Sequence, residues 1–317
     1  MSFALDPDRS IRRGVKDAVR HQLRSAQTHL ELRREDAIHQ ARKSVKKARA
    51  IVALLELADA PPPASHKRRL RDAGRLLSSV RDSAVVVATF DQLRQRSAER
   101  FPAQASASMR RALVGTRTRI AKEAVDNGST AKAKRAIRSV RRSLKKWKFP
   151  DLDSIDLAAV LKESYRSSRK AMTRARSMRE GDLHRWRKKV KTFWYQLRLI
   201  EHLAPGLRSQ VQAFEQLETW LGEHHDLAVL QTAIAGGGNT QRLSARTLSA
   251  VRDVSTRLQE TIGRRALTLG QHLLAESPNA YEASVRRALA PAEPGRAGAA
   301  RVLPPTFEGG VPRSLSP

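Results

Sequence analysis

The sequence predicts an all-α protein in which two pseudo-symmetric helical bundles, the products of an internal duplication, form one compact domain. Three observations support this fold class. Apolar residues recur with helical spacing almost throughout, and no strand-like alternation competes with them. Proline and glycine divide the chain at helix-length intervals. Residues 38–56 and 183–201 repeat one pattern, with His39 and His184 at equivalent positions 145 residues apart, and a repeat of this length indicates a duplicated architecture.

The first half is expected to hold six helices. Asp6-Pro7 is typical of a helix start, and Pro61-Pro62-Pro63 stops the second helix. Phe101-Pro102 and Asn127-Gly128 mark later breaks, and Arg81-Asp82-Ser83 is interpreted as a turn between two helices. The expected helices span residues 8–33, 36–58, 65–80, a segment ending near 97, 104–127 and 130–147.

The motif Phe149-Pro150-Asp151 is the predicted boundary between the halves, which are residues 1–150 and 151–290. Helices are expected to restart from about residue 155, with the second copy of the repeat following. Breaks in this half are expected at Pro205-Gly206, Gly222 and Gly236-Gly237-Gly238. Residues 291–317 are rich in proline, glycine and arginine, and are predicted to be a disordered tail.

The composition points to a polyanionic partner. Lysine and arginine number 61 against 31 acids, which gives a net charge of +30 over 317 residues. Such a charge destabilises a compact state by self-repulsion, so nucleic acid, an acidic membrane or a phosphate polymer is the expected class of partner. The absence of cysteine excludes disulfides, thiol catalysis and cysteine-based zinc sites. No signal peptide or membrane span is visible, so a cytoplasmic location is expected. Of the three classes of polyanion, the membrane is not expected to be the partner.

Each copy of the repeat carries a basic face that begins at its histidine. On a helical wheel the basic residues lie within roughly 60° of the histidine, opposite an apolar seam. The candidate anion-binding residues are His39, Arg42, Lys43, Lys46 and Arg49 in the first copy and His184, Arg187, Lys188 and Lys191 in the second. No acid interrupts either face, so like charges crowd at i,i+4 spacing, at a cost to the helix. We expect the seams to face the core, the basic faces to turn away from it, and an anion to relieve the repulsion.

Two further stretches, residues 130–149 and 164–179, also contain no acid. Arginine offers a planar fork to phosphate oxygens, whereas lysine offers a mobile point charge, and a site with both suits a flexible phosphate chain. The candidate phosphate contacts from these stretches are Arg138, Arg142, Lys145, Arg166 and Arg169.

A second repeated element ends in Asp82 in the first half and in Asp226 in the second. Either aspartate is interpreted as a helix N-cap, or it holds a basic or histidine side chain in place across the site. The dipeptide His225-Asp226 resembles that of metal-dependent phosphohydrolases, but further ligands are lacking. His39 and His184 among so many cations are poor ligands for a divalent ion, so neither a metal site nor a cofactor is expected.

The pattern His-x-x-Arg-Lys-x-x-Lys, present once in each half, resembles the signature of the CHAD family, the conserved histidine α-helical domain. The resemblance spans roughly residues 8–290. It implies two pseudo-symmetric helical bundles that bind inorganic polyphosphate along a basic channel, and association with polyphosphate granules. It also implies phosphate contacts by the histidine, arginine and lysine residues of the two faces, with Arg166 and Arg169 as additions and Arg20 and Arg24 as their counterparts in the first half.

Two other classes of function remain as alternatives. A basic helical protein that binds nucleic acid fits the charge, but aromatic residues make up only 4% of the chain, which leaves few stacking platforms for single strands. An enzyme acting on phosphate chains would need groups that the sequence lacks, namely a P-loop, a carboxylate cluster and a nucleophile with a partner base. Non-enzymatic polyphosphate binding is therefore the predicted function.

Overall fold

The computed structural model describes residues 3–32, 36–58, 63–101, 103–144, 147, 149, 157–236, 240 and 243–290. Every regular element in these ranges is a helix, so the all-α class is confirmed. The α-helices are α1 (Ile11–Glu31), α2 (Ala37–Leu57), α3 (Ala64–Leu76), α4 (Ser78–Arg96), α5 (Ala103–Asp126), α6 (Ser129–Ser143), α7 (Leu157–Ala175), α8 (Glu180–Ile200), α9 (Arg208–Ala235), α10 (Ala245–Leu273) and α11 (Pro278–Leu289). None of the helices in the described ranges has an apolar stretch that would let it cross a membrane. The predicted tail and Lys145 lie outside these ranges.

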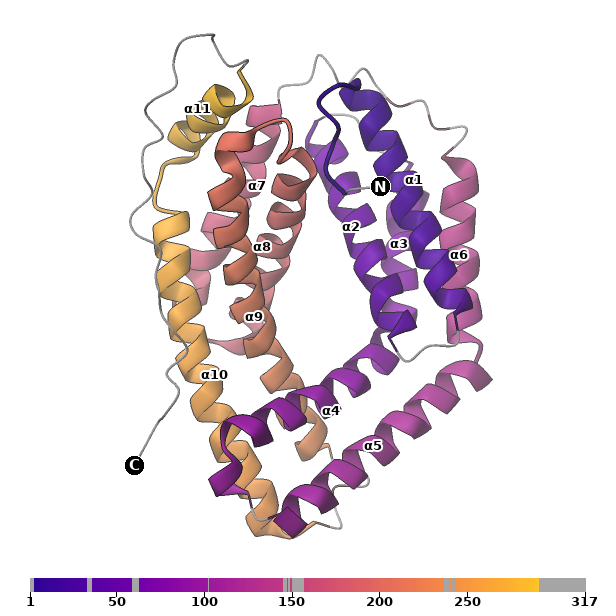
Figure 1. Cartoon of the computed structure of the whole chain (residues 1–317), viewed down its shortest axis with the longest axis vertical. Coiled ribbons are helices and arrows are strands. Elements are labelled where there is room, and N and C mark those ends of the chain that lie inside the picture. Colours follow the sequence, from indigo (N-terminus) through magenta and orange to yellow (C-terminus); the bar gives the residue numbers. More distant parts are fainter. Residues whose placement is uncertain are drawn as a thin grey trace.

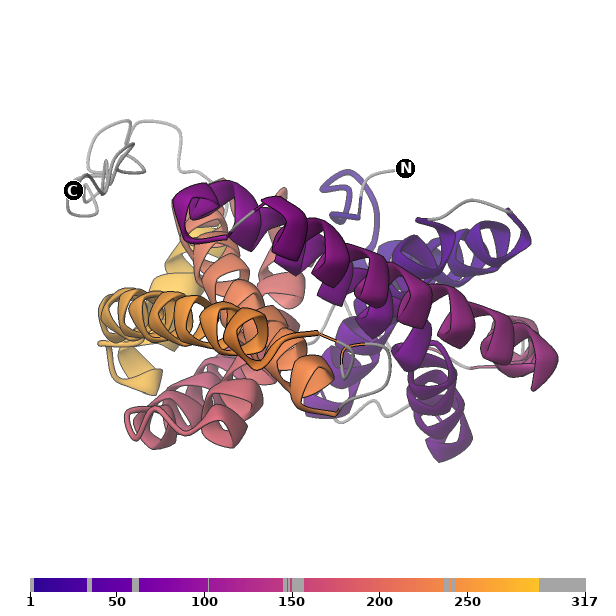
Figure 2. The ribbon, with the colours of Figure 1, turned by 90° about the horizontal axis from the view of Figure 1, so that it is seen from below.

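The helices form two groups that meet along α2 and α8. Helices α1, α2, α3 and α6 pack together on one side, and α7 to α11 pack together on the other (Figure 1). Because α2 contacts α8, the two histidine helices lie side by side at the junction. Helix α4 leaves the first group and packs on α9, and α5 returns across the lower end of the molecule to α6 (Figure 2). The helices of the first half therefore contact the second half in two places.

The apolar seams predicted for the histidine helices are buried, as expected. Val45 of α2 and Val190 of α8 belong to one hydrophobic cluster that both groups of helices share. Trp186, the largest seam residue, is fully buried and packs against α10 at Gly270. A Cβ atom at Gly270 would lie 2.4 Å from Cζ2 of Trp186, so only glycine allows α10 this close to α8.

Two predicted breaks are wrong. Helix α3 ends at Leu76 and α4 begins at Ser78, so Arg81–Ser83 is helical and the corner lies at Leu77, whose burial in the core fixes its position. Gly222 does not interrupt α9, which runs for 28 residues. One glycine costs a helix about 1 kcal/mol, and packing against both α8 and α10 outweighs that cost.

Candidate functional site

Five cationic side chains meet at the junction of α2, α4 and α8. This cationic cluster consists of Arg42 and Lys46 from α2, Arg81 from α4, and Arg187 and Lys191 from α8. Burial, followed by repulsion from the other four cations, lowers the pKa of Lys46 to about 6. The expectation that the basic faces turn away from the core is wrong for their inner edges. Arg187 is only 8% exposed, because the edges of both faces point into the space between the two helices.

Two aspartates hold Arg81 in the cluster. Its guanidinium donates to Oδ1 of Asp82 at 3.1 Å and to Oδ1 of Asp226 at 3.4 Å. Asp82 lies inside α4 and Asp226 inside α9, so the interpretation of these residues as N-caps is wrong. The alternative interpretation, in which they position a basic side chain, describes both.

Glu218 of α9 is the third carboxylate of the site. Lys191 donates to Oε1 of Glu218, and Nη2 of Arg187 lies 3.9 Å from the same oxygen. Glu218 was not among the predicted site residues, because the predicted break at Gly222 separated it from Asp226. On one continuous helix these two acids, eight residues apart, share a face. Three carboxylates therefore face five cations, and part of the positive charge of the cluster stays uncompensated.

Several donors of the cluster have no partner among the residues that the structure describes. Lys46 forms no hydrogen bond or ion pair with any residue that the structure describes. The Nε atoms of Arg42 and Arg187 are buried and likewise lack a partner among those residues. Nη1 of Arg42 donates to Oγ of Ser78 at 2.9 Å and to the carbonyl of Gly74, which fixes the position of the guanidinium. Since buried polar groups normally have partners, these oriented and unused donors favour an anion as ligand.

Other predicted residues surround the cluster. His39, Lys43 and Lys188 are exposed and continue the basic faces toward solvent. Partial burial, and then the charges of Arg81 and Lys46, lower the pKa of His39. Arg49 turns toward α3, since the charges of Arg71 and Arg75 on that helix act on the Arg49 guanidinium.

The structure does not bring the remaining predicted arginines to the cluster. Arg138 and Arg142 are exposed on α6, which packs against α1, α3 and α5. Arg20 and Arg24 are exposed on α1, and Arg20 donates to Asp17 at 3.1 Å. These residues form basic surface apart from the α2–α8 junction.

The two arginines predicted on α7 are also engaged elsewhere. Arg166 donates to Glu163 of its own helix at 2.6 Å. Nε of Arg169 donates to the carbonyl of Leu274, at the end of α10, at 3.1 Å. Both residues therefore have structural partners away from the two histidine helices.

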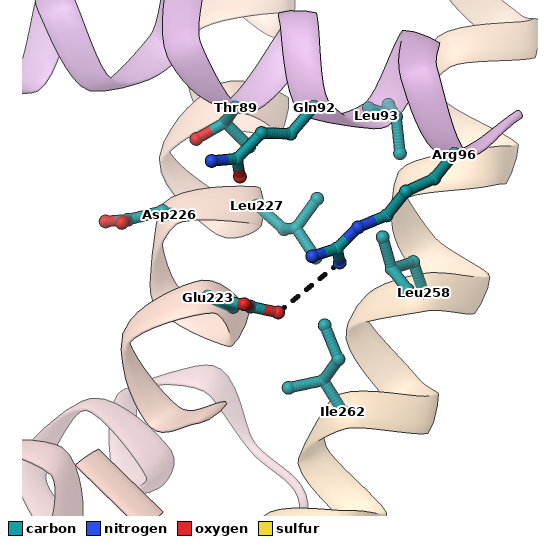
Figure 3. Close-up of a pocket in the computed structure, with 9 residues that line it drawn as sticks. All are labelled: Thr89, Gln92, Leu93, Arg96, Glu223, Asp226, Leu227, Leu258 and Ile262. Carbon is teal, nitrogen blue, oxygen red and sulfur yellow. Dashed lines mark hydrogen bonds and ion pairs between the residues drawn. The ribbon is translucent and has the colours of Figure 1, made fainter. Parts of the chain in front are cut away.

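Two cavities adjoin α4 and α9. The smaller one, about 30 Å³, has room for little more than a water molecule. Figure 3 shows Arg96 of α4 reaching across it to Glu223 of α9 at 3.4 Å, while the Asp226 carboxylate points away from that pair. The larger cavity, about 570 Å³, lies between α4, α5, α9 and α10, and its wall includes Glu180 and His225.

The fold and the cationic cluster define an all-helical protein in which two basic helices lie side by side. At their junction they hold cationic donors that have no partner among the described residues. The family model of the CHAD domain matches residues 17–235 of the sequence, which is more than half of the chain. The protein therefore belongs to the CHAD domain family. No curated protein matches the chain.

Two solved structures share the fold. The CHAD domain from the plant Ricinus communis has a TM-score of 0.66 and 17% sequence identity, over 87% of this chain and 95% of that one. PptA from Streptomyces chartreusis has a TM-score of 0.57 and 15% identity, over 84% of this chain and 100% of that one. At such low identity the likeness concerns the helical architecture and not the residues of the site.

Proposed function

We propose that this protein binds inorganic polyphosphate along the basic surface that joins α2 and α8, as membership of the CHAD family implies. The observation that carries the proposal is the set of unpaired donors in the cationic cluster, namely Lys46 Nζ, Arg42 Nε and Arg187 Nε. Phosphate oxygens accept charge-assisted hydrogen bonds from such groups. A bound phosphate would also neutralise the repulsion that lowers the pKa of Lys46.

The distribution of charge suits a polymer better than a single phosphate ion. The exposed His39, Lys43 and Lys188 extend the cluster outward along both helices, so several phosphates of one chain have partners at once. Binding of this kind releases counterions from the polymer. The net charge of +30 provides long-range attraction, which supports an association with polyphosphate granules.

We propose binding without chemical change of the polymer and without a cofactor. The three carboxylates of the site are engaged with Arg81, Lys191 and Arg187, and none is paired with a hydroxyl nucleophile from the part of the chain that the structure describes. The cluster therefore offers charge and hydrogen bonds to a phosphate chain, and its acids serve to position cations.

Polyphosphate affinity is expected to fall steeply with salt. With about four charge contacts and a slope near 0.7 for each, affinity should drop roughly 50-fold between about 50 and 200 mM salt. Isothermal titration with long-chain polyphosphate at several salt concentrations measures this slope, and the recovered samples, assayed with Mg²⁺ present, should contain no released orthophosphate. A salt-independent affinity contradicts the electrostatic mechanism, and phosphate release contradicts the non-enzymatic one.

Polyphosphate should also displace nucleic acid from the protein. The donors at the α2–α8 junction suit phosphate oxygens, whereas the aromatic residues of α8, including Trp186 and Phe193, are buried and offer no surface for bases. In a competition assay with labelled DNA at physiological salt, we expect polyphosphate to win at equal phosphate concentration. Preferential retention of the DNA would favour the nucleic-acid-binding alternative.

A further inference from the structure

The two lysines of the cationic cluster have different partners, although they are equivalent in sequence. Lys46 and Lys191 occupy the same position in the two copies of the repeat. Lys191 donates to Oε1 of Glu218, and its Nζ lies 5.8 Å from the ring centre of Tyr195. Lys46 forms no hydrogen bond or ion pair with any residue that the structure describes. The duplicated site is therefore asymmetric, because a carboxylate already occupies one of its two lysines.

Glu218 has no acidic counterpart in the first half of the chain. When the alignment of the second repeated element is extended toward the N-terminus, Glu218 corresponds to Gly74. The carbonyl of Gly74 accepts a hydrogen bond from Nη1 of Arg42. Oε1 of Glu218 lies 3.9 Å from Nη2 of Arg187, which is the equivalent arginine. The two positions therefore correspond in space as well as in sequence, and a full negative charge is present at only one of them.

The surroundings of Glu218 indicate what its carboxylate replaces. The residue is buried where α9 packs on α8, with 9% of its surface exposed. A buried carboxylate normally needs a charged, hydrogen-bonded partner, and Lys191 and Arg187 provide the opposite charge. A carboxylate oxygen and a phosphate oxygen accept the same charge-assisted hydrogen bond. Glu218 therefore takes up a donor of Lys191 that a phosphate would otherwise use.

We propose that Glu218 is an internal counter-ion that occupies Lys191 in place of phosphate and thereby lowers the affinity of the site for a polyanion. The inference rests on the proposed polyphosphate function, and it assigns the strong end of the site to Arg42 and Lys46 on α2. A phosphate bound there lies close to the carboxylate, because Lys191, which Glu218 contacts, is the cation that acts most strongly on Lys46. Glu218 thus repels that phosphate in addition to engaging Lys191.

Glu218→Gln tests the proposal through the sign of its effect. Glutamine has nearly the same shape and keeps an oxygen for Lys191, but it removes the negative charge. We expect the affinity of the full-length protein for long-chain polyphosphate to rise at least about tenfold, because like charges a few ångströms apart in a partly buried site repel strongly. Isothermal titration at physiological salt measures the ratio to the wild type. An unchanged or lower affinity overturns the proposal, since a carboxylate that only positions Lys191 causes no gain when it is removed.

Glu223→Gln is the matched control. Glu223 lies on the same helix and contacts Arg96 at 3.4 Å, outside the cationic cluster. Its replacement changes the net charge by the same amount, so we expect only a small gain in affinity. Equal gains in the two glutamine variants would attribute the effect to net charge and would overturn the proposal.

Gly74→Glu is the reverse test, and it does not depend on the stability of the Glu218 variant. A Cβ atom at Gly74 would meet no neighbouring atom of the described residues within 4 Å, so the new side chain has room. Its carboxylate should engage Arg42 and Lys46 and weaken polyphosphate binding at least about tenfold. Unchanged affinity in this variant overturns the inference while the proposed function stands. Absence of binding by the wild-type protein would overturn the proposed function, and this inference with it.

Discussion

Replacement of Lys46 and Arg187 together by glutamine is expected to weaken polyphosphate binding about 100-fold or more. Each residue brings a donor that has no partner among the described residues, and a hydrogen bond to a charged group contributes about 1.5–3 kcal/mol. The slope of affinity with salt should fall by about 1.4 as two phosphate contacts are lost. Calorimetric titration of the double variant at several salt concentrations measures both effects. The fold should persist, since Lys191 still neutralises Glu218.

Arg138→Gln combined with Arg142→Gln is the control for this double variant. It removes the same charge from exposed positions on α6, away from the α2–α8 junction. We expect only a small loss of affinity, caused by the lower net charge. Equal losses in the two double variants would show that total charge, and not the cationic cluster, determines binding.

Lys46→Met is expected to stabilise the free protein while it weakens polyphosphate binding. In the folded protein Lys46 is partly buried among four cations and has no counter-ion among the described residues, so its charged form is disfavoured. Replacement of a buried charge by an apolar side chain of similar size should raise the unfolding free energy by about 1–4 kcal/mol. Thermal or urea unfolding at neutral pH measures the gain, and a loss of stability would contradict the expected environment of Lys46.

The stability gain from Lys46→Met should depend on pH. The pKa of Lys46 is about 6 in the folded protein against an ordinary value of 10.5, so the unfolded chain binds more protons between these two values. The contribution of Lys46 to stability therefore becomes less unfavourable as the pH rises from about 6 to 10.5. The advantage of the methionine variant should be largest near pH 6 and should shrink toward pH 10.

The same residue couples polyphosphate binding to proton uptake. Near pH 8 Lys46 is neutral in the free protein, and an adjacent phosphate restores its charge, so one proton is expected to enter on binding. Calorimetry in two buffers of different ionisation enthalpy counts that proton. Lys46→Met should abolish this proton uptake. Lys43→Met, which removes an exposed lysine of the same face, should leave the proton uptake unchanged.

The sequence predicted the helices and four of the five residues of the cationic cluster because both depend on local periodicity. The seams containing Val45 and Val190 follow helical spacing, and their burial was correct. The pattern of cations around Lys46 and Arg187 was visible for the same reason. The role of Arg81 was missed, since its segment was interpreted as a turn, although the alignment of Asp82 with Asp226 had already marked this position.

Local sequence patterns are enough to specify an all-helical chain, a strong excess of positive charge and two copies of a histidine-led basic helix. Packing between the helices places α2 and α8 side by side, with the inner edges of their basic faces directed at each other. The same packing selects the acids that hold the cations, because Glu218 and Asp226 reach them from α9 across the junction. Helical periodicity specifies which residues share a face, but the neighbour of that face depends on packing between helices far apart in the chain.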